Sequence, residues 1–356
     1  MKGQEVKMEL SELQKEILNS KCTRSVVISS AASGKTRLLT EKVRQLLRAN
    51  INPHSIAVIT FTNMAATELR QRLDTDYKDG LFVGTIHALA NYMLCRKGID
   101  TNKIIDNEEF DKLFELIYQN PQAIIHYRWI LLDEAQDSDK LQFNFLFNQI
   151  APENFFVVGD PKQAIYGFKG SDYHLIYYLV RKYGATMFDM NENYRNSSKI
   201  LTFAKDLIKP TGLLDQSISM TGTCGEVFQI PFSTQIIIDA IKEDGNYKNW
   251  AILTRTNKEI YDISYCLKIN NIPFDTFKQG DLTKDELSEK MTQDTVKVLT
   301  VHSAKGLEWD NVIVVGMRYY NNEERNVCYV AATRARKKLM WMRTAAPKRK
   351  ASIPSY

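Results

Sequence analysis

The sequence predicts an α/β protein built from two lobes. Short runs of β-branched and other apolar residues alternate with longer amphipathic stretches, which is the pattern of parallel sheets covered by helices. The chain has 356 residues, more than the roughly 100–200 residues of one typical domain. Each half is therefore long enough to bury a core of its own. One strand-to-helix turn consists of small residues, which is typical of a loop that holds phosphate.

Four candidate strands lie in each half of the chain. In the first half they span residues 25–29, 56–61, 129–133 and 155–159, and in the second 250–254, 296–301, 312–316 and 338–342. The first four end in polar or small residues, and the carboxyl ends of parallel strands are where α/β sheets bind ligands. A polar stretch, 189–193, separates the two series. We therefore expect one lobe over residues 1–188 and a second over 189–356.

Composition excludes several classes of protein. Lys plus Arg exceed Asp plus Glu by 47 to 42, a net charge of +5 that permits nucleic-acid binding without indicating it. The five cysteines are scattered and form no C-x-x-C pair, which argues against a disulfide framework and against a zinc site. No apolar run approaches about 18 residues, and residues 1–19 are polar. We expect a cytoplasmic or nucleoplasmic protein with no membrane partner.

Residues 29–36, SSAASGKT, form the candidate phosphate loop. They fit the end of the pattern G-x-x-x-x-G-K-[ST], with Ser29 at the position of the first glycine. Apolar residues recur at helical spacing after Lys35, so the loop lies between a strand and a helix. Backbone N–H groups of such a loop surround phosphate oxygens, Lys35 supplies a positive charge, and the Thr36 hydroxyl is a candidate ligand of Mg²⁺. The alternative is a purely structural turn of small residues.

Polar residues follow two further strands of the first half. Asp133 and Glu134 come after an apolar strand, which suits Asp133 as an Mg²⁺ ligand and Glu134 as the group that polarises an attacking water. In the segment 159–163, GDPKQ, the Gln163 amide is a candidate partner of the terminal phosphate or of that water. The alternatives are a solvated strand end and an ordinary turn.

Aromatic residues and a cation follow this segment directly. Tyr166, Phe168 and Lys169 are a candidate platform on which unpaired bases stack. Aromatic residues at this spacing could equally belong to a core.

Taken in order, these segments resemble the UvrD/Rep/PcrA-like branch of the superfamily 1 DNA helicases, over nearly the whole chain from Leu10 to Trp341. The matching segments are LSELQ (10–14), the phosphate loop, TFTNMAA (60–66), GTIH (84–87), DEAQD (133–137), GDPKQAIYGFKG (159–170), NYR (193–195), AILTRTN (251–257), VHSAKGLE (301–308) and VAATRA (330–335). Each segment alone is weak, and their common order gives the resemblance its strength.

The resemblance implies two RecA-like lobes with ATP and Mg²⁺ in the cleft between them. Gln14 would read the adenine, Tyr194 would stack on it, and Arg195 and Arg334 would reach the terminal phosphates from the second lobe. Glu308 would couple that lobe to the nucleotide. The loop residues implied as nucleotide contacts are Ala32, Ser33, Gly34, Lys35, Thr36 and Arg37. The residues implied along a single-stranded DNA path are Phe61, Asn63, Thr85, His87, Tyr166, Phe168, Lys169 and His302. Surface ion pairs for the two arginines, and structural roles for the two histidines, are the alternatives.

The sequence departs from the family pattern in composition and in length. Ala32 replaces a usual glycine, Met64 a usual lysine and Lys169 a usual arginine. Only 45 residues separate His87 from Asp133, and only 44 separate Arg255 from Thr300, where the family carries large accessory insertions. The remaining insertions, about 91–126 and about 258–294, must be small. A protein partner or self-association could take their place. A compact form would suit a plasmid-encoded enzyme, or a virus-encoded enzyme acting in host cytoplasm.

The resemblance implies an ATP-dependent translocase or helicase that moves 3′ to 5′ on single-stranded DNA. An RNA-directed motor is one alternative, because stacking and backbone contacts do not distinguish the two polymers. A nucleotide-gated clamp or a partner-activated loading factor is another. The basic run PKRK (347–350) could add phosphate contacts, act as a localisation signal, or be a solvated tail.

Overall fold

The computed structural model describes residues 9–73, 80–278 and 281–343, which divide into two compact units. Unit 1 comprises Met1–Tyr194 and Asp215–Ser217, and unit 2 comprises Arg195–Leu214 and Ile218–Tyr356. The predicted boundary at 188/189 falls inside strand β6 (Thr186–Met190), which pairs with β1 (Arg24–Ser29) along its length. The basic run 347–350 lies outside the described residues.

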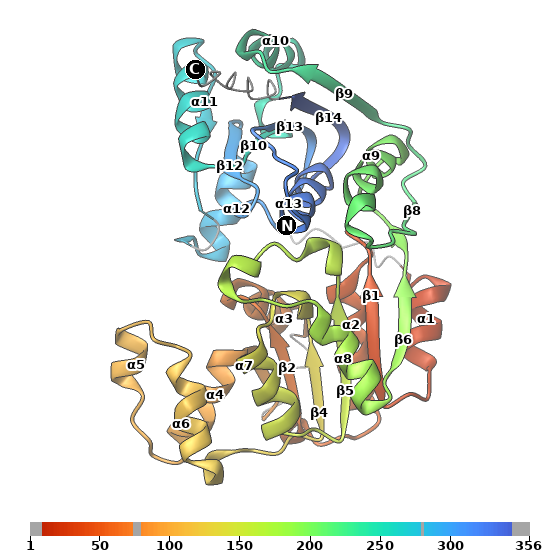
Figure 1. The fold of residues 1–356 in the computed structure, drawn as a ribbon, viewed down its shortest axis with the longest axis vertical. Coiled ribbons are helices and arrows are strands. Elements are labelled where there is room, and N and C mark those ends of the chain that lie inside the picture. The colour runs from red at the N-terminus through yellow and green to blue at the C-terminus, as the bar shows by residue number, and fades with distance from the viewer. Residues whose placement is uncertain (1–8, 74–79, 279–280, 344–356) are drawn as a thin grey trace, which may run out of the picture. The chain divides into compact units, whose positions relative to one another are not determined.

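Unit 1 contains a six-stranded parallel sheet in the order β3-β2-β4-β5-β1-β6 (Figure 1). Its remaining strands are β2 (Ile56–Thr60), β3 (Phe82–Thr85), β4 (Trp129–Leu132) and β5 (Asn154–Gly159). The four strands expected in this half are present. β3 and β6 were not predicted, because β3 has only four residues, one of them Gly84, and β6 is largely exposed.

Helices cover both faces of this sheet. Alternate residues of each central strand enter two separate cores: Val26 of β1 and Phe155 of β5 face one, whereas Val27 and Phe156 face the other. One core is closed by α1 (Glu12–Asn19), α2 (Lys35–Arg48) and α3 (Asn63–Leu73). The other is closed by α4 (Ile86–Arg96), α6 (Lys112–Gln119), α7 (Lys140–Asn144) with the π-helical turn η5 (Phe145–Gln149), and α8 (His174–Tyr183). The expected short insertion 91–126 comprises the end of α4, α5 (Asn102–Asp106) and α6.

Unit 2 contains a second six-stranded parallel sheet, in the order β11-β12-β10-β13-β14-β9. Its strands are β9 (Glu226–Pro231), β10 (Trp250–Thr254), β11 (Phe274–Asp275), β12 (Val296–Thr300), β13 (Trp309–Val315) and β14 (Ala335–Arg343). Its helices are α9 (Ser198–Ile208), α10 (Thr234–Asp244), α11 (Asn257–Ile269), α12 (Lys284–Thr292) and α13 (Asn322–Ala332). Two further strands are very short: β7 (Glu192–Asn193), which belongs to unit 1, and β8 (Ile218–Ser219), which belongs to unit 2. The four predicted strands are present, and the edge strands β9 and β11 were missed.

The packing of unit 2 follows the same two-sided plan. Helices α10 and α11 contribute Ile237, Ile241, Ile263 and Leu267 to a core with β10, β12 and β13, and α9 packs against α13 and β14. The predicted α/β class, with two helix-covered parallel sheets, is confirmed. Among the described helices, none has the length and apolar character needed to cross a membrane.

Candidate functional site

The phosphate loop, residues 30–34, connects β1 to the amino terminus of α2. Ala32 (φ 52°) and Gly34 (φ 85°) both adopt left-handed backbone conformations that turn the chain into the helix. Gly34 is the N-cap of α2 and makes no side-chain capping bond. A β-carbon at Gly34 would lie 2.9 Å from Gln14 Nε2. The first N–H groups of α2, together with the helix dipole, therefore form a site that favours an anion.

Hydrogen bonds from two separate segments hold the carbonyl groups of the loop. Gln14 Nε2 donates to Ser33 O (3.0 Å), Asn193 Nδ2 to Ala31 O (2.9 Å) and Tyr194 N to Ala32 O (3.1 Å). Tyr194 is 40% exposed, and its hydroxyl donates to Glu192 (3.0 Å). The structure thus brings Gln14 and Tyr194, the two residues that the resemblance assigns to the adenine, beside the phosphate loop.

A hydrogen bond of the Ser29 side chain accounts for the serine at the position where the phosphate-loop pattern has its first glycine. The Ser29 hydroxyl donates to Gly159 O at 3.1 Å, so it ties the end of β1 to the end of β5. Ala32, which replaces a usual glycine of the family pattern, carries an energetic cost. A residue with a β-carbon in the left-handed region is destabilised by about 1–2 kcal/mol. The neighbouring hydrogen bond from Tyr194 to the Ala32 carbonyl helps to hold this conformation.

Asp133 and Glu134 follow β4 at the same edge of the sheet. The Asp133 carboxylate is 3% exposed and accepts hydrogen bonds from Thr36 Oγ1 (3.0 Å) and Glu134 N (2.9 Å). Burial, and then the charge of Glu134, raise the pKa of Asp133 to about 6, although Lys35 and Thr36 act in the opposite direction. Lys35 Nζ lies 3.5 Å from Glu134 Oε1. A second positive charge would therefore be stabilised beside Asp133.

Thr36 and Asp133 together fit a magnesium ion. Both offer oxygen ligands, and Mg²⁺ in nucleotide sites is usually held by one or two protein oxygens while phosphates and water complete its shell. The described residues contain no cluster of three or more His, Cys, Asp or Glu side chains arranged for a metal.

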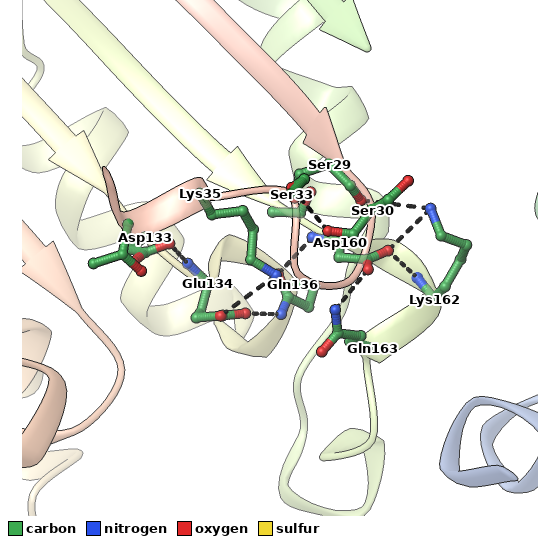
Figure 2. A network of polar contacts seen from close by, with 12 residues as sticks. Ser29, Ser30, Ser33, Lys35, Asp133, Glu134, Gln136, Asp160, Lys162 and Gln163 are labelled. Carbon is green, nitrogen blue, oxygen red and sulfur yellow. Dashed lines mark hydrogen bonds and ion pairs between the residues drawn. The ribbon is translucent and has the colours of Figure 1, made fainter. Parts of the chain in front are cut away.

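The segment after β5 contains a buried ion pair that the sequence did not reveal (Figure 2). Asp160 is fully buried; its carboxylate lies 3.1 Å from Lys162 Nζ and accepts a 2.7 Å hydrogen bond from Gln163 Nε2. Burial opposes the charge of Lys162, but the Asp160 carboxylate and further acidic groups raise its pKa above the ordinary value. The Lys162 amino group also lies 3.5 Å from Ser29 O. This pair joins the segment that carries Gln163 to the start of the phosphate loop.

Gln136 was also missed by sequence reasoning. It lies in the turn η4 (Ala135–Asp137), donates to the Glu134 carboxylate through Nε2, and accepts from Asp160 N at 2.9 Å through Oε1. The only signal for Gln136 in the sequence was its position two residues after Glu134, within the segment DEAQD (133–137). The contact to Asp160 depends on the pairing of β4 with β5 and cannot be found from local sequence.

The residues of the predicted aromatic platform lie close together in unit 1, and base stacking on them stays a prediction. The rings of Phe61 and Tyr166 stack with centroids 5.5 Å apart, Tyr166 and Phe168 are 6.2 Å apart, and Lys169 Nζ lies 5.6 Å from the Tyr166 centroid. Phe168 is 67% exposed, so it is not a core residue. Burial, together with Asp137 and Glu134, raises the pKa of Tyr166, which places this ring within electrostatic reach of the acidic site. Asn63 begins α3, close in sequence to Phe61.

Thr85 and His87 have structural contacts of their own. The Thr85 hydroxyl caps α4 by accepting from Ala88 N (3.2 Å). The His87 ring lies 5.1 Å from that of Phe114, and its Nε2 lies 3.4 Å from Asp111 Oδ1. Contact of either residue with a strand stays a prediction.

The predicted residues of unit 2 form a separate group. Glu308 bridges two guanidinium groups by ion pairs with Arg195 and Arg336. Arg334 is only 1% exposed, and its guanidinium donates to Val330 O (3.0 Å) and Leu307 O (3.2 Å). Arg334 is therefore not a surface residue, whereas Arg195 pairs with Glu308, whose side chain is 30% exposed, so the alternative of an ion pair stands for Arg195. His302 is half-buried on the loop after β12, where its carbonyl accepts from Lys305 N (3.4 Å).

The geometry of unit 1 defines the class of protein to which the chain belongs. A parallel sheet with a small-residue loop at a helix amino terminus, and with acidic residues at neighbouring strand ends, is the P-loop type of α/β nucleotide-binding fold. Residues 10–125 and 121–184 match the UvrD/REP helicase N-terminal domain, and residues 277–345 match the UvrD-like helicase C-terminal domain. The chain belongs to the UvrD/Rep helicase family, as the resemblance predicted.

Several curated proteins are similar to this chain. DNA helicase II of Escherichia coli strain K12 is 24% identical over 74% of the chain and 51% of its own length. A putative ATP-dependent DNA helicase of Acanthamoeba polyphaga mimivirus is 26% identical over 91% of the chain and 52% of its own length. A probable DNA helicase of Mycoplasma pneumoniae is 23% identical over 92% of the chain and 82% of its own length. The chain spans about half the length of the first two of these relatives.

Glu308→Gln should lower the free energy of unfolding at neutral pH, and the loss should disappear in acid. Burial opposes ionisation of Glu308, but Arg195 and Arg336 outweigh it and hold the pKa of Glu308 below the ordinary 4.5. A lowered pKa stabilises the fold above the unfolded-state value, and this contribution is lost as the pH falls through the folded-state value. Urea denaturation from pH 7 downward should therefore show a gap between wild type and variant that narrows below pH 4.5.

Glu226→Gln is the matched control, because Glu226 pairs with Lys338 at 3.4 Å through largely exposed side chains. Such surface pairs contribute about 0–1 kcal/mol, so this variant should track wild type throughout. A Glu308→Gln gap that stays constant across the acidic range would contradict the assigned pair.

Proposed function

We propose that the chain is an ATP-dependent motor that moves 3′ to 5′ along single-stranded DNA, as a translocase or a DNA helicase. The observation that carries the proposal is the continuity of residues 159–169, which begin beside the phosphate loop and end in the aromatic platform. A strand on the platform and a nucleotide on the loop would contact one short segment. The names of the three relatives, all DNA helicases, support DNA as the polymer.

In this proposal the ATP phosphates bind at the amino terminus of α2. Loop residues 32–37 surround them, Lys35 supplies charge, and Gln14 and Tyr194 flank the adenine. Thr36 and Asp133 would hold Mg²⁺, which when bound neutralises charge that develops on the phosphates. Glu134 accepts a proton from the attacking water, and Gln163 contacts that water or the terminal phosphate.

Unit 2 contributes positive charge and part of the strand path. Arg195 and Arg334 stabilise the negative charge of the transition state, a role worth roughly 10³–10⁵ in rate where it has been measured in related chemistry. Glu308 contacts Arg195 directly and would couple its position to the rest of the unit. His302 would contact the strand, together with Phe61, Asn63, Thr85, His87, Tyr166, Phe168 and Lys169 of unit 1.

The small size of the insertions affects how strongly we expect the chain to unwind duplex DNA. Because the segment 91–126 comprises only short helices, we expect translocation without strong duplex separation by the isolated chain. A protein partner or self-association would supply the missing contacts. An RNA-directed motor and a nucleotide-gated clamp are the competing functions, and the following experiment separates them.

Steady-state ATP hydrolysis should be stimulated by single-stranded DNA in wild type and abolished in Glu134→Gln. Loss of a general base typically costs about 10²–10⁴-fold in rate, whereas nucleotide affinity should persist because Lys35 and Thr36 are unchanged. Stimulation by RNA alone would favour the RNA-directed motor. Hydrolysis that neither polymer stimulates would contradict the motor and favour the clamp.

Phe168→Ala should weaken binding of single-stranded DNA by about 5- to 150-fold, since one base–aromatic stack contributes roughly 1–3 kcal/mol. Fluorescence anisotropy with a labelled oligonucleotide measures the change. Tyr118→Ala is the control, because Tyr118 is an exposed aromatic residue (79%) on α6, outside the segment 159–169. Equal affinities for wild type and Phe168→Ala would remove Phe168 from the strand path.

A further inference from the structure

A continuous chain of hydrogen bonds runs from Glu134 to Gln163 (Figure 2). Gln136 connects the Glu134 carboxylate to the backbone N–H of Asp160, and the Asp160 carboxylate accepts from Gln163 Nε2. Gln136 and Asp160 are each fully buried. Glu134 and Gln163, which we propose act on the attacking water, are therefore connected through Gln136 and Asp160. Neither of these two connecting residues contacts the nucleotide in the proposal.

The chemistry of this bridge requires an amide at residue 136. The Glu134 carboxylate can only accept, and the Asp160 N–H can only donate, so the bridging side chain needs a donor and an acceptor. A carboxylate at residue 136 would instead face Glu134 with like charge. An apolar side chain would leave the buried Asp160 N–H without this acceptor, which costs about 1–3 kcal/mol.

Gly159 provides the space for the bridge. A β-carbon at this position would lie 3.0 Å from Gln136 Oε1 and 2.7 Å from Ile176 Cδ1. Both contacts are tighter than side chains normally allow, so the glycine permits the close approach of Gln136 to β5.

At Asp160 the hydrogen-bonded bridge joins residues 159–169, the segment that also contains Tyr166 and Phe168 of the aromatic platform. Asp160, Lys162 and Gln163 are joined by the buried ion pair and the amide contact, and Lys162 also reaches Ser29 O. Only Ala164 and the buried Ile165 separate this turn, η6 (Pro161–Gln163), from Tyr166 and the next turn, η7 (Gly167–Lys169). A displacement of the platform would thus be transmitted through a short, internally bonded segment.

We propose that Gln136 is a positioning residue that fixes the Glu134 carboxylate to residues 159–163, so that a strand bound on the Tyr166–Phe168 platform alters the placement of Glu134. The inference rests on the proposed function and deepens it, because it identifies the contact by which DNA stimulates hydrolysis. Gln136 acts through Glu134 and not on the nucleotide.

The test compares wild type with Gln136→Met, which keeps the length of the side chain and removes both hydrogen bonds. We expect the DNA-stimulated kcat to fall by roughly 10- to 100-fold, the scale expected when a reacting group is displaced by about 1 Å. The KM for ATP and the affinity for single-stranded DNA should stay within about twofold, because the loop and the platform are unchanged. The ratio of stimulated to unstimulated rate should fall with kcat.

Gln136→Glu is the second variant. It keeps an acceptor for the Asp160 N–H and replaces the donor to Glu134 by a carboxylate of like charge, so it should lose stimulation; its thermal unfolding is measured beside that of wild type so that loss of the fold is recognised. Gln142→Met is the control, since Gln142 is another buried glutamine (7% exposed) whose side chain belongs to the capping box of α7. It should lose some thermal stability and keep full stimulation.

Failure of the inference differs from failure of the proposed function. If DNA does not stimulate wild type, the proposed function is wrong. If DNA stimulates wild type and both Gln136 variants equally, Gln136 does not position Glu134. If the variants raise the KM for ATP and weaken DNA binding in step with lost stability, the bridge is merely structural and the inference is overturned.

Discussion

Hydrogen bonds to the carbonyl groups of the phosphate loop hold unit 1 in the form that its proposed chemistry needs. Gln14 and the adjacent residues Asn193 and Tyr194 are both distant from the loop in sequence, and each of the three donates to a different carbonyl of the loop. Because these carbonyls are hydrogen-bonded, the loop keeps the left-handed conformations at Ala32 and Gly34 and leads directly into α2. The open helix amino terminus, and the placement of Lys35 and Thr36, depend on this arrangement.

Buried charge is the second feature that shapes the site. Asp133, Lys35, Asp160 and Lys162 are all nearly inaccessible to solvent, and burying charges is unfavourable unless they are paired and hydrogen-bonded. The charge of Lys162 is compensated by Asp160, whereas the pKa of Asp133 is raised because this carboxyl is buried and because Glu134 lies beside it. The two acidic residues at the end of β4 therefore favour the arrival of a cation, and the pair after β5 acts as a fixed support.

The sequence predicted those parts of the fold and site that local pattern determines. Central strands such as β4 and β10 are buried along their whole length and read as unbroken apolar runs. The edge strands β6 and β9 are largely exposed, β9 ends at Pro231, and β11 has two residues, so none produced such a run. The loop and the acidic pair were visible as short motifs. The Gln136–Asp160 contact and the Arg195–Glu308 pair join residues far apart in sequence, and only strand order brings them together.

The most direct test of the account is whether the loop of unit 1 binds the phosphates of a magnesium nucleotide. Titration of wild type and Lys35→Met with a non-hydrolysable ATP analogue, with and without Mg²⁺, measures this by calorimetry. The account predicts Mg²⁺-dependent binding to wild type and a loss of about 10- to 150-fold in the variant, as expected when a charge-assisted hydrogen bond of roughly 1.5–3 kcal/mol is removed. Equal affinities for the two proteins would contradict the assignment of the loop and of everything built on it.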